Sequence, residues 1–225
     1  LSSNSAAQTL HNTFWDDSYN RNLRLQDVEI EIRLGKCPVN GRGPFNTSIS
    51  KKQFDSIVTS LSAFHKWDKT EYTESVVGYF PKVDDSIRVI MNSDGSTTIT
   101  SKQKVVQADF LGKDLPFDFR LAVNIELNLR DSNIYNLKSA QRIVNRKRHS
   151  FTLKNFRYDL TRVIEKSGNV VHQIEIEIIN LPDIQIEQSN SQVVTRELQS
   201  RIVELLNSIE PVRSFNIELL RKRQF

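Results

Sequence analysis

The sequence predicts a mainly β (α+β) protein, a closed antiparallel barrel of about eight strands with flanking helices. Two segments, 28–32 and 174–178, alternate glutamate with valine or isoleucine. Between residues 70 and 165, further alternating segments are separated by turn residues. Successive side chains of a strand point to opposite faces, so each segment has an apolar face for the core and a charged face. Two segments with helical spacing of apolar residues complete the pattern.

The first elements are a strand over 26–34, ended by Gly35, and a helix after residue 50. Ser50 and Gln53 form a capping box that marks the start of this helix. Its apolar residues fall on one stripe, which predicts a helix packed on the outside of the barrel. These stripe residues are Phe54, Ile57, Val58, Leu61 and Phe64.

The middle of the chain predicts a meander of strands joined by turns. Asp94-Gly95 is typical of a hairpin turn, and Ser167-Gly168-Asn169 turns the last pair. The expected strands cover 71–80, 85–91, 96–107, 119–129, 146–153, 156–165 and 170–179.

We expect one domain over residues 1–225. Residues 1–22 form a polar N-terminal arm in this interpretation. The segment 183–225 contributes C-terminal helices that pack on the barrel, because apolar residues from 193 to 206 recur at three- and four-residue spacing. Pro211 ends that run.

Composition narrows the functional class. The 225 residues are 38% hydrophobic and carry a net charge of +4, which allows a large core and weakly favours an anionic partner. The single cysteine, Cys37, excludes an intramolecular disulfide and a structural thiolate zinc site, which fits an intracellular protein. No stretch approaches the roughly 18 apolar residues of a membrane span, so no membrane association is expected.

The four glutamates of the two alternating strands are the strongest functional signal. Glu29 and Glu31 share one strand face, and Glu175 and Glu177 share another. They either lie on ordinary solvated faces or converge inside a closed barrel. Converging carboxylates demand a cation, and oxygen ligands favour Mg²⁺ or Mn²⁺.

Basic residues follow the same alternation. Any single charged face is more typical of a solvated strand, but their joint occurrence favours a barrel whose mixed lining holds a metal ion and polyphosphate. The residues that share these faces are Arg146 with Arg148, Arg157 with Asp159 and Thr161, Lys102 with Lys104, Arg120 with Glu126, and Arg88 between apolar neighbours.

Together these motifs resemble those of the fungal-type RNA 5′-triphosphatases, the metal-dependent β subunit of the mRNA capping enzyme, within the triphosphate tunnel metalloenzymes. The resemblance covers most of the chain. Its carriers are Glu29-Ile30-Glu31, Glu175-Ile176-Glu177, Arg157-Tyr158-Asp159-Leu160-Thr161, Arg146-Lys147-Arg148, Asp85-Ser86-Ile87-Arg88 and the stretch from Phe117-Asp118-Phe119-Arg120 to Glu126. Gln173 stands where the family often has a further glutamate.

The resemblance implies a role for each motif residue. Glu29, Glu31 and Glu177 resemble the metal ligands, and Glu175 resembles the residue that orients water. The phosphate-binding cations would be Arg88, Lys102 or Lys104, Arg146 or Lys147, and Arg148, with Arg120 as a further substrate contact. Arg157, Asp159, Thr161 and Glu126 resemble supporting residues of the tunnel floor.

The family implies an enzyme that hydrolyses the γ-phosphate of the 5′-triphosphate end of nascent pre-mRNA, the first step of cap formation. It also implies a nuclear homodimer that contacts the mRNA guanylyltransferase or the C-terminal domain of RNA polymerase II. Two alternatives stay open. One is a tunnel-type inorganic polyphosphatase or nucleoside triphosphatase, and the other is a noncatalytic RNA-binding barrel.

Overall fold

The computed structural model describes residues 27–39, 42–81, 85–129, 135, 137–179, 188–211 and 216–224. The expected N-terminal arm over 1–22 lies outside the described residues. In chain order the elements are β1 (Val28–Gly35), α2 (Lys51–Ala63), β2 (Lys69–Pro81), β3 (Asp85–Asn92), β4 (Thr97–Lys113), β5 (Asp118–Asn128), η2 (Leu137–Ser139), β6 (Arg142–Leu153), β7 (Phe156–Glu165), β8 (Val170–Ile178), α3 (Gln188–Asn207) and β9 (Asn216–Gln224).

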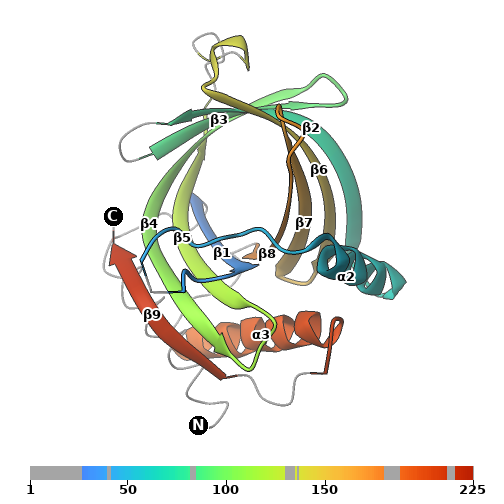
Figure 1. Cartoon of the computed structure of the whole chain (residues 1–225), viewed down its shortest axis with the longest axis vertical. Coiled ribbons are helices and arrows are strands. Elements are labelled where there is room, and N and C mark those ends of the chain that lie inside the picture. The colour runs from blue at the N-terminus through green and yellow to red at the C-terminus, as the bar shows by residue number, and fades with distance from the viewer. Residues whose placement is uncertain are drawn as a thin grey trace.

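Eight of the strands form a closed antiparallel barrel, as the sequence predicts (Figure 1). Their order around the barrel is β3-β2-β6-β7-β8-β1-β5-β4, and the pairing of β3 with β4 closes the circle. The two strands from opposite ends of the chain, β1 and β8, are neighbours, with Glu31 directly across from Glu177. Closure therefore places both Glu-x-Glu motifs on one wall of the interior.

Strand β4 is longer than predicted because its edge opposite β5 pairs with two strands in succession. Its first half pairs with β3 and its second half, 106–113, pairs with β9. A bulge between Lys104 and Val106 separates the two halves. The segment 183–225, where we expected helices, thus contains one helix, α3, and then a strand.

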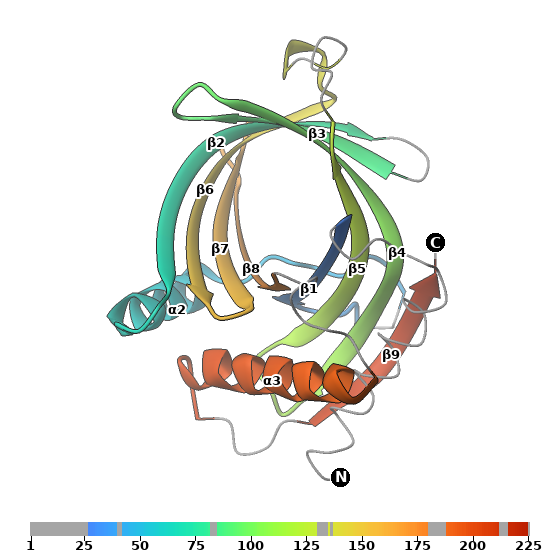
Figure 2. The ribbon, with the colours of Figure 1, turned by 180° about the vertical axis from the view of Figure 1, so that it is seen from behind.

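The main apolar core lies outside the barrel, on the face opposite the charged interior. Ile30, Ile32 and Ile176 are buried there against both helices. Helix α2 contributes Phe54, Ile57 and Leu61, and its N-terminus is capped by Ser50, whose hydroxyl accepts a hydrogen bond from the Gln53 amide. Helix α3 lies beneath the barrel and contributes Leu198, Ile202, Leu205 and Leu206 (Figure 2).

Helices and strands thus cover the apolar faces and turn the charged faces inward. Of the helices in the described parts of the chain, none is both long and apolar enough to span a bilayer.

Candidate active site

The barrel interior holds a cavity of about 420 Å³. Its lining comes from strands β1 to β8, and most of it is charged. The carboxylates are Glu29, Glu31, Glu126, Glu175 and Glu177, and the cations are Arg33, Arg88, Lys102, Lys104, Arg120, Arg142, Arg146, Arg148 and Arg157. The charged faces of the eight strands therefore line one common cavity.

The acidic wall is formed by β1 and β8 with help from β5. The Asn124 amide donates to both Glu29 Oε2 at 3.0 Å and Glu31 Oε1 at 3.2 Å, which holds the two carboxylates on the same side. Glu31 is only 4% exposed. Hydrogen bonding to both anions fixes their positions before any ligand arrives.

Cations of the chain neutralise this wall. The Lys102 ammonium pairs with Glu29 and lies 3.1 Å from Glu31 Oε1. The Arg33 guanidinium lies 3.0 Å from Glu31 Oε2 and 3.0 Å from Glu175 Oε1. Burial opposes ionisation of Glu31, but Arg33 and Lys102 outweigh it and lower the pKa of Glu31 to about 2. Glu31 is thus an anion at neutral pH.

Glu177 behaves differently although it pairs with Arg157. The pKa of Glu177 is raised to about 8, mainly by burial; Arg157 opposes the shift, and Glu29, Asp159 and Glu31 contribute to it. Burial likewise raises the pKa of Glu29, supported by Glu31. Repulsion between these carboxylates adds to the effect of burial on the pKa of Glu29 and of Glu177.

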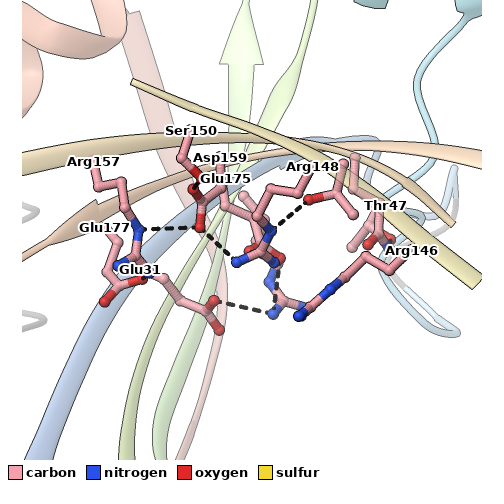
Figure 3. Close-up of polar contacts among 12 residues, drawn as sticks. Glu31, Thr47, Arg146, Arg148, Ser150, Arg157, Asp159, Glu175 and Glu177 are labelled. Carbon is pink, nitrogen blue, oxygen red and sulfur yellow. Dashed lines mark hydrogen bonds and ion pairs between the residues drawn. The ribbon is translucent and has the colours of Figure 1, made fainter. Parts of the chain in front are cut away.

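Asp159 lies at the floor of the barrel, where it contacts both Arg157, beside the acidic wall, and Arg148 of the basic wall. It is 1% exposed, and its carboxylate accepts hydrogen bonds from Ser150 at 2.6 Å, Arg148 at 2.7 Å and Arg157 at 3.2 Å (Figure 3). Arg148 also donates to Thr161 Oγ1 at 3.0 Å. Asp159 therefore orients two arginines toward the interior, consistent with the floor role that the resemblance implies.

The basic wall contains a cation that no carboxylate neutralises within the described residues. Arg146 donates from Nε to the Ser75 hydroxyl at 3.1 Å, and no ion pair joins it to a described residue. Burial lowers the pKa of Arg146 to about 10, with Arg148 and Arg88 adding to the effect. A buried cation beside other cations is stabilised by an anion, so this wall is suited to a phosphate group.

The remaining lining cations are paired. Arg88 of β3 binds Glu126 of β5 at 2.6 Å, beside Glu29 of the acidic wall. Arg120 binds Asp109 at 2.6 Å, and its guanidinium also lies 4.8 Å from the centre of the Phe45 ring. The sequence left open whether Lys102 or Lys104 faces the interior. Both side chains line the cavity.

Two candidates do not line the cavity: Asp159, which is buried beneath the lining and holds Arg148 and Arg157, and Lys147. The Lys147 side chain lies on the outer face of β6, where the ammonium is 3.0 Å from Glu74 Oε1. Strand alternation explains this position, because Arg146 and Arg148 on either side point inward. A substrate role for Lys147 inside the barrel is therefore incorrect.

Sequence reasoning missed several lining residues. Arg33 and Asn124 share parity with residues that were identified, so alternation could have found them. Ser75 carries no charge and gave no signal. Thr47 lies in a loop and contacts the site only through Gln173, whose amide donates to its hydroxyl at 2.9 Å. The position of Gln173 inside the cavity is confirmed, and its amide serves as a loop anchor.

The donor set of the acidic wall fits a hard divalent cation. Glu29, Glu31 and Glu177 offer only oxygen atoms, which Mg²⁺ and Mn²⁺ prefer, and repulsion from Glu29 and Glu31 adds to burial in raising the pKa of Glu177. Among the described residues no three acidic, histidine or cysteine side chains are grouped closely enough to hold an ion as they stand. Lys102 and Arg157 occupy the same carboxylates instead.

A closed antiparallel barrel with an acidic and a basic wall facing one cavity defines the class of triphosphate tunnel proteins. Comparison with known proteins agrees. The sequence pattern of the family described as "mRNA capping enzyme, beta chain" matches residues 41–215, and the chain belongs to this family of fungal-type RNA 5′-triphosphatases, which are hydrolases. The matched range includes Glu175 and Glu177 but begins after Glu29 and Glu31.

Two solved structures share the fold. The RNA triphosphatase Pct1 of S. pombe superimposes with a TM-score of 0.74 at 17% identity, over 91% of this chain and 93% of that one. Pct1 in complex with the Spt5 CTD gives a TM-score of 0.73 at 19% identity, over 90% and 93% of the two chains. No curated protein sequence matches the chain.

Proposed function

We propose that this chain removes the γ-phosphate from the 5′-triphosphate end of nascent pre-mRNA, the first step of cap formation. One observation carries the proposal. The half-buried Arg146, which has no carboxylate partner among the described residues, shares a cavity with the carboxylates Glu31 and Glu177. A substrate that is anionic and that also binds a divalent cation satisfies both walls at once.

The metal in this proposal is Mg²⁺ or Mn²⁺, held by Glu29, Glu31 and Glu177. When bound, it would supply positive charge to the phosphate oxygens during transfer. Lys102 and Arg157 pair with the same carboxylates in this structure, and with a metal bound there their ammonium and guanidinium groups would be free to contact the phosphates.

The basic residues position the triphosphate. Arg146 and Arg148 are placed to bind the phosphates directly, since Asp159 and Thr161 fix Arg148 and Ser75 fixes Arg146. Arg88, Lys102 and Lys104 complete the binding set from β3 and β4. Such preformed donors stabilise charge in the transition state because they need no reorganisation.

Glu175 is the proposed residue that orients the attacking water. It lies one inward position along β8 from Glu177 and is held by Arg33 at 3.0 Å. A carboxylate in this position accepts a proton from water while the neighbouring cations hold the phosphate in line. Glu126 holds Arg88 of β3 in place.

The partners and compartment belong to the same proposal. The S. pombe relative was solved with the Spt5 CTD, which supports a flexible C-terminal domain of the transcription machinery as a partner class. A complex with the mRNA guanylyltransferase or the polymerase C-terminal domain, a homodimer and a nuclear location complete the proposal.

The test is phosphate release from γ-labelled, triphosphate-terminated RNA with Mg²⁺, with Mn²⁺ and with EDTA. We expect release that depends on the metal and that falls at least about 100-fold in Glu31→Ala, because the ligand set loses its most buried anion. Glu74→Ala is the matched control, since Glu74 pairs with Lys147 on the outer face.

Three outcomes separate the alternatives. Release from tripolyphosphate or ATP with none from RNA would assign the chain to polyphosphate or nucleotide hydrolysis. RNA retention without release in either metal would support the noncatalytic binding barrel. Release in EDTA equal to that in Mg²⁺ would remove the metal from the proposal.

A further inference from the structure

One mouth of the cavity differs from the rest of the lining because it is aromatic and apolar. At the end where β2 and β7 finish and β6 begins, Tyr79 lies directly across from Arg142 of β6. The Arg142 guanidinium is 5.4 Å from the centre of the Tyr79 ring and lies over it. Both side chains line the cavity.

The ladder between β2 and β6 gives the order of side chains from this mouth inward. Tyr79 faces Arg142 first, then Val77 faces Val144, and then Ser75 faces Arg146. Val77, Val144 and Val163 form a small buried cluster, and Tyr79 packs against it. From Arg142 to Arg146 the strand covers about 13 Å. Arg146 thus lies two inward positions along β6 from the Tyr79–Arg142 pair, beyond this apolar cluster, of which Val163 lines the cavity.

This arrangement matches a ligand with an anionic chain at one end and a flat ring at the other. When the phosphates of a nucleotide bind Arg146 and Arg148, its nucleoside lies beside Tyr79 and Arg142. Aromatic rings and guanidinium planes are the usual stacking surfaces for bases. Arg142 is held by the Tyr79 ring and by Glu165 at 2.7 Å, yet its side chain is 52% exposed, so one face is open for stacking.

We propose that Tyr79 and Arg142 form a binding site for the first nucleoside of the substrate, which makes the tunnel prefer a triphosphate that carries a nucleoside over inorganic polyphosphate. The inference rests on the proposed hydrolysis of triphosphate ends and names the part of the substrate recognised at this mouth. The base is recognised by its flat face, so the site is tolerant of base identity.

The test compares kcat/KM for a short triphosphate-terminated RNA with kcat/KM for tripolyphosphate, which has no nucleoside. The Tyr79→Leu variant should lower the RNA-to-tripolyphosphate ratio about tenfold, the loss expected for one stacking contact. Arg142→Met should lower the same ratio, and it removes a half-exposed residue whose loss the fold tolerates. Tyr79→Phe keeps the ring and should keep the ratio of the wild type.

Tyr72→Leu is the matched control, because Tyr72 lies on the outer face of the same strand, where its hydroxyl donates to Glu74. It should leave both substrates unchanged. An unchanged ratio in both Tyr79→Leu and Arg142→Met, whatever the absolute rates, overturns the nucleoside site. A wild-type enzyme that hydrolyses tripolyphosphate but not RNA shows instead that the proposed function itself is wrong, and the nucleoside site with it.

Discussion

The acidic and basic walls of the tunnel differ in how completely the protein satisfies them. On the acidic wall, Glu29 and Glu31 share Lys102, and Glu177 pairs with Arg157. On the basic wall, Arg146 has only the Ser75 hydroxyl among the described residues. Within the described residues the protein thus supplies cationic partners for Glu29, Glu31 and Glu177 but no carboxylate for Arg146. The difference teaches that an anion could bind Arg146 without breaking an ion pair, whereas the proposed metal would have to displace Lys102 and Arg157.

The largest expected loss of activity follows from substitutions in the acidic wall. Glu31→Ala and Glu177→Ala should each lower kcat/KM at least about 100-fold, and the double variant should cost little more than either single one. The two carboxylates lie directly across from each other, so both changes remove the same ion. A double-mutant cycle on kcat/KM gives the coupling. Losses that add would show that Glu31 and Glu177 serve separate sites.

A smaller effect sharpens the role of the basic wall. Arg146→Ala should lower kcat/KM for triphosphate-terminated RNA about 100-fold, the usual cost of one preformed donor to a transition-state charge. Lys147→Ala is one residue away on the same strand and should stay within about twofold, because its ammonium faces outward and its exposed ion pair contributes little. Equal losses in the two variants would contradict the inward placement of Arg146.

The smallest effect concerns stability against pH in the absence of metal. The pKa of Glu177 is about 8 in the fold and about 4.5 as a free side chain. A raised pKa stabilises the fold fully at low pH, and this contribution is lost as pH rises toward 8. In EDTA the Tm should therefore fall by several degrees between pH 6 and pH 8.5.

Two comparisons isolate the contribution of Glu177. The Glu177→Gln variant should show a flatter profile of Tm against pH, since an amide does not titrate. Added Mg²⁺ or Mn²⁺ should raise the wild-type Tm more at pH 8.5 than at pH 6, because only the ionised carboxylate binds the metal. A variant with the same slope as the wild type would assign the pH dependence to another group.

Alternation along strands predicted most of the fold and most of the site lining. It placed Glu29, Glu31, Arg146 and Arg148 on inward faces without any tertiary information, because a closed barrel turns one face of every strand inward. It also identified the capped start of α2. The inward placement of the charged residues was predictable because few folds other than a closed barrel bring so many charged strand faces together.

Features that depend on register or on irregular backbone were not predictable. Strand β9 was missed because Leu219 and Leu220 interrupt its alternation, and a register shift opposite Asp109 and Phe110 accommodates the doubled leucine. Residue type suggested Lys147 as a phosphate ligand, but strand parity placed it outside. The contact from Thr47 depends on the path of a loop, which no periodic pattern encodes.

Because Lys102 and Arg157 pair with the carboxylates, this barrel can fold without a metal ion, which many metalloproteins cannot do. A site built from carboxylates alone would repel itself without its ion, and folding would then require metal. Here the resident ammonium and guanidinium groups balance the acidic wall from within. The chain can therefore be synthesised, folded and stored while divalent ions are scarce. Under the proposed mechanism, a change in their supply would alter the activity of the enzyme and leave the barrel folded.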